Sequence, residues 1–239
     1  MSVFGLVLAI VVGANGPGVN VGRKIDDFRL QDFRGASHAL SDIPKEKLVV
    51  VAFLGTECPL AKLYAPRLNE LAQEFETKGV QFVAVLSNRQ DAIKEIEHFA
   101  KKQEISYPVL KDAGNAVADQ FGAERTPEIF VLDQNRVVRY HGRVDDQFGV
   151  GYLRPAPTRS DLKEALNELL AGKEVSVAKT PAPGCFIGRV KPVDEHAEVT
   201  YSNQIARIFQ KRCVECHRPG QIAPFSLTSY EESAGWAET

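Results

Sequence analysis

The stretch KLVVVAFLGTECPLAKLYAPRL, residues 47–68, decides how this chain folds. Its first part, residues 47–55, is a continuous run of mostly β-branched and apolar residues, which is typical of a strand buried on both faces. From Leu60 to Lys78, apolar residues recur at helical spacing. Cys58 lies between the two, and Pro59 suits the first position of a helix. The stretch therefore predicts a strand, a cysteine and a helix in direct succession.

The position of Cys58 gives its thiol a chemical advantage. The first N–H groups of a helix and the helix dipole stabilise negative charge. A thiol in that place tends to have a lowered pKa and to be a better nucleophile at neutral pH. A redox site of the dithiol type would carry its second cysteine where this chain has Ala61. The stretch is therefore a redox site only if another thiol reaches Cys58, and an inert cysteine at a helix start is the alternative.

Strand-like and helix-like segments alternate along residues 20–172. Helices between buried strands imply a mostly parallel sheet covered on both faces, and a late hairpin with a tight turn at Gln134-Asn135 adds antiparallel strands. We therefore predict an α/β fold with a central mixed sheet flanked by helices. Within GRVDD we expect a local ion pair between Arg143 and Asp145. The further expected strands are residues 80–87, 107–112, 128–133 and 136–142, the expected helices are residues 91–102, 114–121 and 160–171, and residues 28–42 form a leading hairpin.

Composition and the N-terminus narrow the class of protein. The chain has 239 residues, a net charge of −2 and 44% hydrophobic residues, which is ordinary globular composition without a basic patch for nucleic acid. Residues 3–12 are almost wholly apolar and small residues follow, as in a secretory signal, although a basic start is missing. The run is too short for a transmembrane helix. We expect a signal peptide at residues 1–16, with a frayed segment or an apolar strand as the alternatives.

The order of elements and the stretch FLGTECPLAKLYAPRL, residues 53–68, resemble the thioredoxin superfamily. RTPEIFVLD, residues 125–133, resembles the second hallmark of that superfamily, a cis-proline loop that leads into a strand. The resemblance covers about residues 20–187 and implies a thioredoxin-like fold. It also implies that Thr126 and Pro127 shape the site, because the cis-proline of this superfamily packs beside the active-site cysteine and helps to hold the substrate backbone. The matching positions of the first motif are Phe53, Cys58, Lys62, Ala65 and Pro66.

The chain departs from the dithiol members of the superfamily. Glu57 stands where tryptophan is usual, and Ala61 stands where the second cysteine is usual. A single cysteine also resembles peroxiredoxins, but their threonine lies three residues before the reactive cysteine, whereas Thr56 lies two residues before Cys58. A thiol peroxidase is therefore an alternative. The closer resemblance is to the peroxiredoxin-like redoxin subgroup of the AhpC/TSA type, which the sequences CPxxK, YHGRVDD and GCxI match.

The last of those matches contains Cys185, which follows TPAPG on an expected extended arm. An arm in that place could fold back to the pocket of Cys58 and supply the missing thiol. The resemblance thus implies Cys58 as the nucleophile and Cys185 as a resolving partner that can form a disulfide with it. Its implied substrates are protein or small-molecule thiols and disulfides, with no cofactor for this domain. The alternative is that Cys185 packs as a small buried apolar residue.

A second motif, Cys213-Val214-Glu215-Cys216-His217, is the signature of c-type haem attachment. In such sites the two thiols add to the haem vinyl groups and the histidine binds the iron. Residues 205–232 resemble the opening of cytochrome c-like domains that precede copper-dependent monooxygenase modules. Half of a zinc site and a structural disulfide are the alternatives.

The residues after His217 bear on that second motif, because they include no methionine and no further histidine that could serve as a second iron ligand. We therefore expect the cytochrome to continue beyond Thr239. Residues 200–239 are then expected to pack poorly or as isolated helices, without a closed haem pocket.

The sequence thus predicts a signal peptide at residues 1–16, a redoxin domain at 17–172, an arm at 173–199 and an incomplete cytochrome c-like segment at 200–239. The predicted function is thiol–disulfide oxidoreduction in a bacterial periplasm, cell envelope or secreted protein, where disulfides persist. A downstream cytochrome or oxidase module is the expected partner. A binding or scaffold module that keeps the fold without redox chemistry is the alternative from another class.

Overall fold

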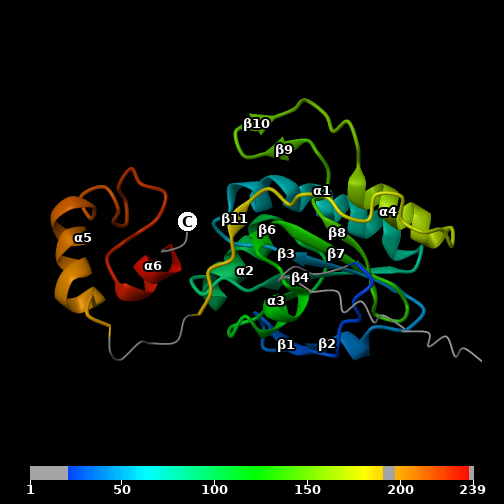
Figure 1. Cartoon of the computed structure of the whole chain (residues 1–239), viewed down its shortest axis with the longest axis horizontal. Coiled ribbons are helices and arrows are strands. Elements are labelled where there is room, and N and C mark those ends of the chain that lie inside the picture. The colour runs from blue at the N-terminus through cyan, green and yellow to red at the C-terminus, as the bar shows by residue number, and fades with distance from the viewer. Residues whose placement is uncertain (1–20, 191–196, 237–239) are drawn as a thin grey trace, which may run out of the picture.

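The computed structural model describes residues 21–190 and 197–236, so the predicted signal peptide lies outside the described residues. A seven-stranded mixed sheet with the order β2-β1-β5-β4-β3-β7-β8 runs through the larger part, and helices cover both of its faces (Figure 1). The parallel strands β3, β4 and β5 form its centre. The predicted α/β fold is confirmed. The strands are β1 (Arg29–Asp32), β2 (Ser37–Ala39), β3 (Leu48–Phe53), β4 (Val80–Leu86), β5 (Val109–Lys111), β7 (Glu128–Leu132) and β8 (Val138–Gly142).

Strand β3 is the strand predicted from the opening stretch, and all six of its residues are buried. Its side chains alternate between the two faces of the sheet, so that Val50 and Ala52 join one apolar cluster and Phe53 joins the other. Fully burying one large apolar side chain contributes about 1.5–3 kcal/mol. Helix α1 (Pro59–Glu76) follows with Pro59 in its first turn. The buried strand therefore fixes the N-terminus of α1 in space.

The two clusters cover opposite faces of the sheet. The first receives side chains from α1, from α2 (Ile93–Lys102) and from α4 (Asp161–Leu170). The second receives side chains from α3 (Ala116–Phe121) and the 3-10 turn η1 (Leu40–Asp42). In the second cluster, the ring of Phe130 meets those of Phe53 and Phe121 edge to face at centroid distances of 5.6 and 5.1 Å. Cys58 belongs to the first cluster, on the α1 face.

The hairpin between β7 and β8 has the tight turn that was predicted at Gln134-Asn135. The Asp133 side chain accepts hydrogen bonds from the backbone N–H groups of Asn135 and Val137 at 2.8 and 2.9 Å. Arg136 adopts the left-handed conformation with φ of 62°. The strands pair antiparallel with a bulge that absorbs one register shift.

The ion pair predicted between Arg143 and Asp145 is wrong. Arg143 donates instead to Asp161 at the start of α4, at 2.7 Å, and Asp145 accepts from Arg67 of α1 at 2.6 Å. Each side chain has thus found a partner on a helix that packs against the loop. The packing of α1 and α4 against the loop, rather than closeness in sequence, therefore decides these two ion pairs.

A small hairpin, β9 (Phe148–Gly149) and β10 (Tyr152–Leu153), lies between β8 and α4 and was not predicted. It projects beyond α1 at the top of Figure 1. Its strands have two residues each, which is too short for any periodic pattern.

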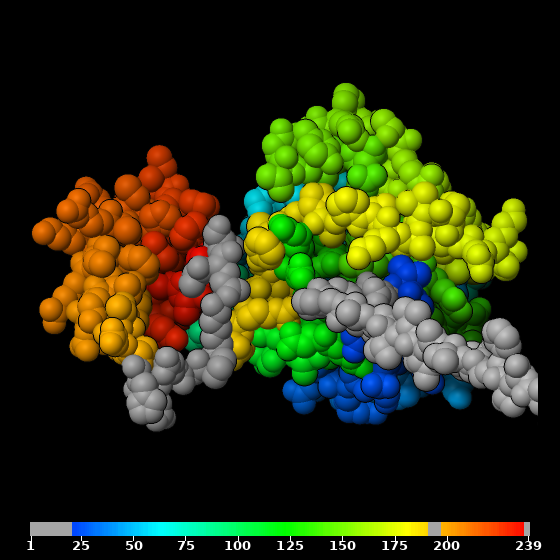
Figure 2. All heavy atoms as spheres, viewed as in Figure 1, coloured from blue at the N-terminus to red at the C-terminus, as the bar shows by residue number. Residues whose placement is uncertain are grey.

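The chain after α4 runs back across the sheet domain as an extended arm, coloured yellow in Figures 1 and 2. Its first anchor is at β8, where the Thr180 N–H donates to the His141 carbonyl at 3.0 Å. Its second anchor is β11 (Cys185–Phe186), which pairs antiparallel with β6 (Arg125–Thr126). Ile187 then enters the second cluster and is 2% exposed. The arm is therefore fixed on both sides of Cys185.

Residues 197–236 form a smaller tail beside the sheet domain, coloured orange and red in Figure 2. Its elements are the π-helical turn η2 (Tyr201–Ile205), α5 (Ala206–Arg212) and α6 (Tyr230–Gly235). The ring of Tyr201 contacts those of Phe209 and Tyr230 at centroid distances of 6.3 and 5.3 Å, so these elements touch one another and the expectation of isolated helices is wrong. The Arg89 guanidinium lies over Tyr230 at 5.1 Å and joins the tail to the sheet domain. Within residues 21–190 and 197–236, no helix has the length and apolar character needed to cross a membrane.

Candidate functional site

Cys58 is the N-cap residue of α1, and it is only 4% exposed. Its backbone N–H donates to the Gly55 carbonyl at 3.3 Å, which closes the turn between β3 and α1. A side chain at Gly55 would come within 2.5 Å of Nδ2 of Asn88, so glycine permits this close approach. The turn holds the thiol at the end of the first cluster, next to the first N–H groups of α1.

The loop predicted to contain a cis-proline lies against Cys58. The peptide bond between Thr126 and Pro127 is cis. Sγ of Cys58 donates a hydrogen bond to the Thr126 carbonyl at 2.9 Å. The Thr126 hydroxyl is buried and has no hydrogen-bond partner among the described residues while Cys58 is a thiol. The structure therefore brings Thr126 to Cys58, with Pro127 next along the chain.

The structure also brings Cys185 to this site. Cys185 lies opposite Thr126 in the β6–β11 pair, and its thiol is in hydrogen-bond contact with the thiol of Cys58. Gly184 makes the approach feasible, because its φ is 151° and any side chain there would clash with the Thr126 carbonyl. Both cysteines are free thiols. The predicted disulfide stays a prediction, with its two thiols in contact.

The two thiols have opposite electrostatic environments. The Cys185 thiol donates to the Cys58 sulfur and is the largest influence that lowers the pKa of Cys58; burial opposes it, and the Thr126 side chain and the Ala61 N–H support it. The same hydrogen bond to Cys58, together with burial, raises the pKa of Cys185. When the pair loses one proton, the negative charge therefore lies on Cys58. Ala61, which replaces the usual second cysteine, serves the site through its backbone.

A buried polar network behind the site was missed by sequence reasoning. The Asp91 carboxylate accepts from the Thr56 hydroxyl at 2.7 Å and from Nδ2 of Asn88 at 3.0 Å. Burial raises the pKa of Asp91. The Thr56 hydroxyl is thus committed to Asp91, which gives the peroxidase alternative no support from this threonine. Asn88 and Asp91 lie in the loop between β4 and α2, and polar residues after a buried parallel strand were the available signal.

A second missed pair braces the cis-proline loop from the other face of the sheet. Glu128 is 4% exposed, and its Oε2 accepts from the backbone N–H groups of Glu124 and Arg125 at 2.7 and 2.8 Å. Its Oε1 lies 2.5 Å from Nε2 of the buried His141 on β8. A carboxylate that satisfies two backbone donors holds their loop firmly. The signal for this brace was a pair of polar residues in strands that are otherwise apolar.

One carboxylate lies on the exposed side of the site, because Glu57 is exposed next to Cys58. Partial burial and the neighbouring charges of Glu95 and Asp91 raise the pKa of Glu57, whereas Lys62 opposes them. Glu57 therefore ionises less readily than an ordinary glutamate.

The cysteine–histidine motif lies on the tail, in the turn that follows α5. The His217 N–H donates to the Cys213 carbonyl at 2.9 Å, and Nδ1 of His217 lies 3.2 Å from the Phe225 carbonyl. Because a carbonyl oxygen only accepts, Nδ1 carries the proton and Nε2 keeps a lone pair that can bind a metal. Cys213 is half-buried, Cys216 is exposed, and both are free thiols. Accessible thiols and an oriented imidazole fit the chemistry of c-type haem attachment.

The surroundings of the motif are only partly those of a cofactor site. An apolar pocket lies between the tail and the sheet domain, but the three motif residues are not in its lining. In the part of the chain that the structure describes, no group of three His, Cys, Asp or Glu side chains is arranged to hold a metal ion. The half-zinc-site alternative therefore gains no support. The pocket is lined by Arg89, Arg189, Tyr201, Ile205, Phe209, Phe225, Leu227, Tyr230, Ser233, Ala234 and Trp236.

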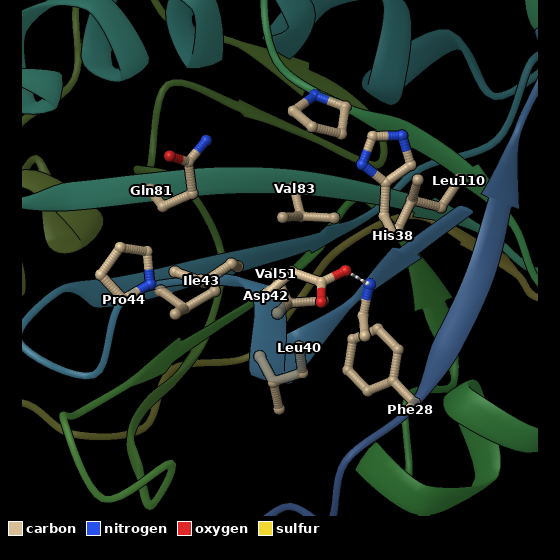
Figure 3. A pocket seen from close by; sticks show the side chains of 13 residues that line it. Phe28, His38, Leu40, Asp42, Ile43, Pro44, Val51, Gln81, Val83 and Leu110 are labelled. Atoms are coloured by element: carbon tan, nitrogen blue, oxygen red, sulfur yellow. Dashed lines mark hydrogen bonds between the residues drawn. The ribbon is translucent and has the colours of Figure 1, made fainter. Parts of the chain in front are cut away.

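Another hollow lies over the second face of the sheet, away from Cys58 (Figure 3). Apolar side chains such as Val51, Val83 and Leu110 form its floor, and η1 forms one wall. Its polar side chains have local roles, because Asp42 accepts from the Ala39 N–H at 2.8 Å. We assign no chemistry to this hollow, since its lining includes no cysteine.

Comparison with known proteins identifies the family of this chain. Residues 21–141 match the model of the AhpC/TSA family. The chain belongs to that family. The family resemblance stated from the sequence is thereby confirmed for the redoxin part.

Particular relatives make the likeness more specific. The thiol-disulfide oxidoreductase ResA of Geobacillus thermodenitrificans is 31% identical over 121 residues, which are 51% of this chain and 68% of that protein. Among solved structures, a hypothetical protein from Sinorhizobium meliloti 1021 is similar with a TM-score of 0.67 and 30% identity, over 73% of this chain and 97% of that one. An uncharacterized conserved protein from Geobacillus kaustophilus has a TM-score of 0.65 and 28% identity, over 73% and 94%.

Proposed function

We propose that this chain is a thiol–disulfide oxidoreductase in which Cys58 is the nucleophile and Cys185 is the resolving thiol. The observation that carries the proposal is the contact between these two thiols beneath the Thr126 carbonyl. A lowered pKa on the thiol at a helix N-terminus supports nucleophilic attack at neutral pH. Similarity to a thiol-disulfide oxidoreductase supports the same class of reaction.

The proposed reaction has two exchange steps. The Cys58 thiolate attacks one sulfur of a substrate disulfide, so a mixed disulfide forms on Cys58 and the other substrate sulfur leaves as a thiolate. Cys185 gives its proton to the first leaving thiolate and attacks Sγ of Cys58, which releases the second substrate sulfur as a thiolate that takes its proton from water. The substrate has then gained two electrons, and the protein holds a Cys58–Cys185 disulfide. An external dithiol returns the protein to its starting state, and the same steps in reverse oxidise a dithiol.

Thr126 and Pro127 would position the reacting sulfur in this scheme. The Thr126 carbonyl accepts from Cys58 while Cys58 is protonated. When Cys58 is a thiolate, it can no longer donate, and the unpartnered Thr126 hydroxyl supplies a donor in its place. Pro127 begins the turn into β7 and keeps the loop in register with Cys58.

A trapping experiment tests the proposal. The reduced Cys185→Ser chain should form a stable mixed disulfide with 2-hydroxyethyl disulfide on Cys58, visible by mass spectrometry, whereas the wild type should pass through it. The Cys58→Ser chain is the matched control and should form none in the sheet domain. Absence of the adduct at Cys58 would favour the scaffold alternative.

We further propose that Cys213, Cys216 and His217 attach a c-type haem in the natural polypeptide that contains them. The support is the motif itself and the hydrogen bond that leaves Nε2 of His217 free to bind iron. Such a group supplies one-electron transfer when it is bound. Cys213 and Cys216 would contribute two thioether links, and His217 would contribute a ligand to the iron.

The haem proposal is tested in the full natural polypeptide, produced in a host with haem attachment machinery. The purified protein should keep haem after denaturation and show the absorption spectrum of a c-type centre. The Cys213→Ser, Cys216→Ser double variant should lose the covalent link. Wild-type protein without covalent haem would contradict the proposal.

We also propose that the protein acts outside the cytoplasm. The apolar run at residues 3–12 and the thiol–disulfide chemistry support this location. N-terminal analysis of the mature protein should find cleavage near residue 16, whereas an intact Met1 on protein isolated from the cytoplasm would argue against it.

A further inference from the structure

The strand edge next to Cys58 is covered by this chain itself. Strand β6 has a single pairing partner among the described residues, and that partner is β11, with Cys185 opposite Thr126 and Phe186 opposite Arg125. The Ile187 N–H extends the pairing by donating to the carbonyl of Glu124 at 2.8 Å. An extended peptide binds a sheet by adding a strand to a free edge. The arm has taken that edge.

Arg125 clamps the arm onto β6. Its guanidinium donates to the Gly184 carbonyl at 2.9 Å and lies over the ring of Phe186 at 4.0 Å. Phe186 is 43% exposed, so the stack is its main packing. A charge-assisted hydrogen bond and a cation–π contact on neighbouring residues hold the arm next to the reactive thiol.

Anchors on both sides prevent the arm from swinging away as a free tail. Before Cys185, the Thr180 hydroxyl accepts from the Arg143 N–H at 3.0 Å. After it, the Gly188 N–H donates to Oδ1 of Asn88 at 3.0 Å, and the Gly188 carbonyl accepts from the Arg89 N–H at 2.9 Å. The arm therefore bridges the site between two fixed points.

Cys185 stands where the cysteine of a paired peptide would stand. Its backbone pairs with the strand beside Cys58, and its thiol contacts the thiol of Cys58. Cys58 is 4% exposed beneath it, and the exposed residues adjoining Cys58 in the sequence are Glu57 and Pro59. A polypeptide disulfide would have to displace the arm in order to align with β6, whereas a small disulfide makes no strand pairing and can approach Cys58 from the side of these two exposed residues.

We infer that the arm acts as a built-in occupant of the peptide edge and restricts this site to low-molecular-weight disulfides. The inference rests on the proposed function and names its substrate class. In the reaction, the small disulfide gains two electrons and leaves as two thiols, and Cys58 and Cys185 close to a disulfide without any movement of the arm anchors. Arg125 is the positioning residue that keeps polypeptides out.

Two substrates and two variants test the inference on the full chain. The rates of reduction of 2-hydroxyethyl disulfide and of a short unstructured peptide cyclised by one disulfide are measured with reduced protein. The wild type should reduce the small disulfide at least about tenfold faster than the peptide at the same protein concentration and pH. The peptide must first displace the arm, and the loss of the charge-assisted hydrogen bond between Arg125 and Gly184 alone is worth about that factor. Arg125→Ala and Phe186→Ala should each raise the ratio of peptide rate to small-disulfide rate by about tenfold.

Arg139→Ala is the matched control, because Arg139 pairs with Asp133 away from the arm, and its ratio should equal that of the wild type. A wild type that reduces the peptide as fast as the small disulfide overturns the inference and leaves the proposed function standing. An unchanged ratio in both Arg125→Ala and Phe186→Ala also overturns it. A wild type that reduces neither substrate overturns the proposed function together with the inference.

Discussion

The molecule carries two pairs of free cysteines that differ in their sequence separation and in their surroundings. Cys58 and Cys185 are far apart in sequence, come from α1 and the arm, and meet in a buried site. Cys213 and Cys216 are close in sequence and lie in one surface turn of the tail. The first pair lies at the start of α1 and next to the Thr126 carbonyl. The second has accessible sulfurs and an adjacent imidazole.

The difference teaches that spacing and environment mark different functions. A short motif can be recognised from the sequence alone, because its residues are close enough along the chain to contact one bound group. When tertiary structure brings a redox pair together, the sequence reveals only one of the two thiols, here the cysteine at a helix start. The second half becomes visible when the arm is seen to pair with β6. Substitutions in and around each pair test this contrast separately.

The largest expected effect is the loss of exchange activity in Cys58→Ser. The rate of 2-hydroxyethyl disulfide reduction should fall by about a thousandfold or more, because the serine hydroxyl is not a nucleophile at neutral pH. Cys185→Ala should keep the first exchange step, which single-turnover kinetics can measure. Exchange that survived in Cys58→Ser would mean that the exposed pair on the tail carries the electrons.

Gly184→Ala should strain the junction of the arm with the cis-proline loop. A side chain there clashes with the Thr126 carbonyl at a φ of 151°, so the free energy of unfolding should fall by about 2–3 kcal/mol in urea titration. Gly172→Ala is the control. It also has a positive φ, of 69°, but open space around it, and it should cost about 1 kcal/mol. Equal losses would show that Gly184 does not define the approach of Cys185.

Glu128→Gln should weaken the brace under the same loop. It exchanges charge-assisted hydrogen bonds to the Glu124 and Arg125 N–H groups for weaker ones and should lower the free energy of unfolding by about 2 kcal/mol. Glu124→Gln, at an exposed side chain, should change it by less than about 0.5 kcal/mol. If both variants matched the wild type, the buried carboxylate would not hold the loop.

The contact between the buried thiols should be visible in a titration. Cys185→Ala removes the largest influence that lowers the pKa of Cys58, so this pKa should rise by about one unit or more, measured by the pH dependence of iodoacetamide alkylation. In the wild type, the pKa of Cys58 lies below its unfolded value of about 8.5. The thiolate therefore adds stability above pH 8.5 that is lost as the pH falls through the folded pKa. An unchanged pH dependence of alkylation would show that Cys185 does not influence the pKa of Cys58.

The smallest effect is expected on the tail. Cys216→Ser replaces an exposed thiol and should change the free energy of unfolding by less than about 0.5 kcal/mol. A larger loss in urea titration would show that the second pair also has a structural role.

Most of the fold was predictable because it depends on local patterns. Consecutive residues determine the buried run of β3, the helical spacing of α1 and the turn at Gln134-Asn135. The wrong ion pair shows the limit of that reasoning. Arg143 and Asp145 are neighbours in sequence, but Asp161 and Arg67 on packed helices are their partners.

The site was predictable in part for a related reason. Cys58 and Thr126 follow from two motifs, whereas Glu128 and His141 are buried polar residues in two different strands, and only the sheet register brings them together. The role of Ala61 was also hidden, because its contribution comes from the backbone N–H rather than from a side chain.

Disulfide mapping tests the central claim most directly. The fully reduced chain is treated with limiting 2-hydroxyethyl disulfide, blocked with iodoacetamide, digested and analysed by mass spectrometry. The account predicts that the first protein disulfide joins the peptides that contain Cys58 and Cys185, while Cys213 and Cys216 are alkylated. A first disulfide between Cys213 and Cys216, with Cys58 alkylated, would contradict it.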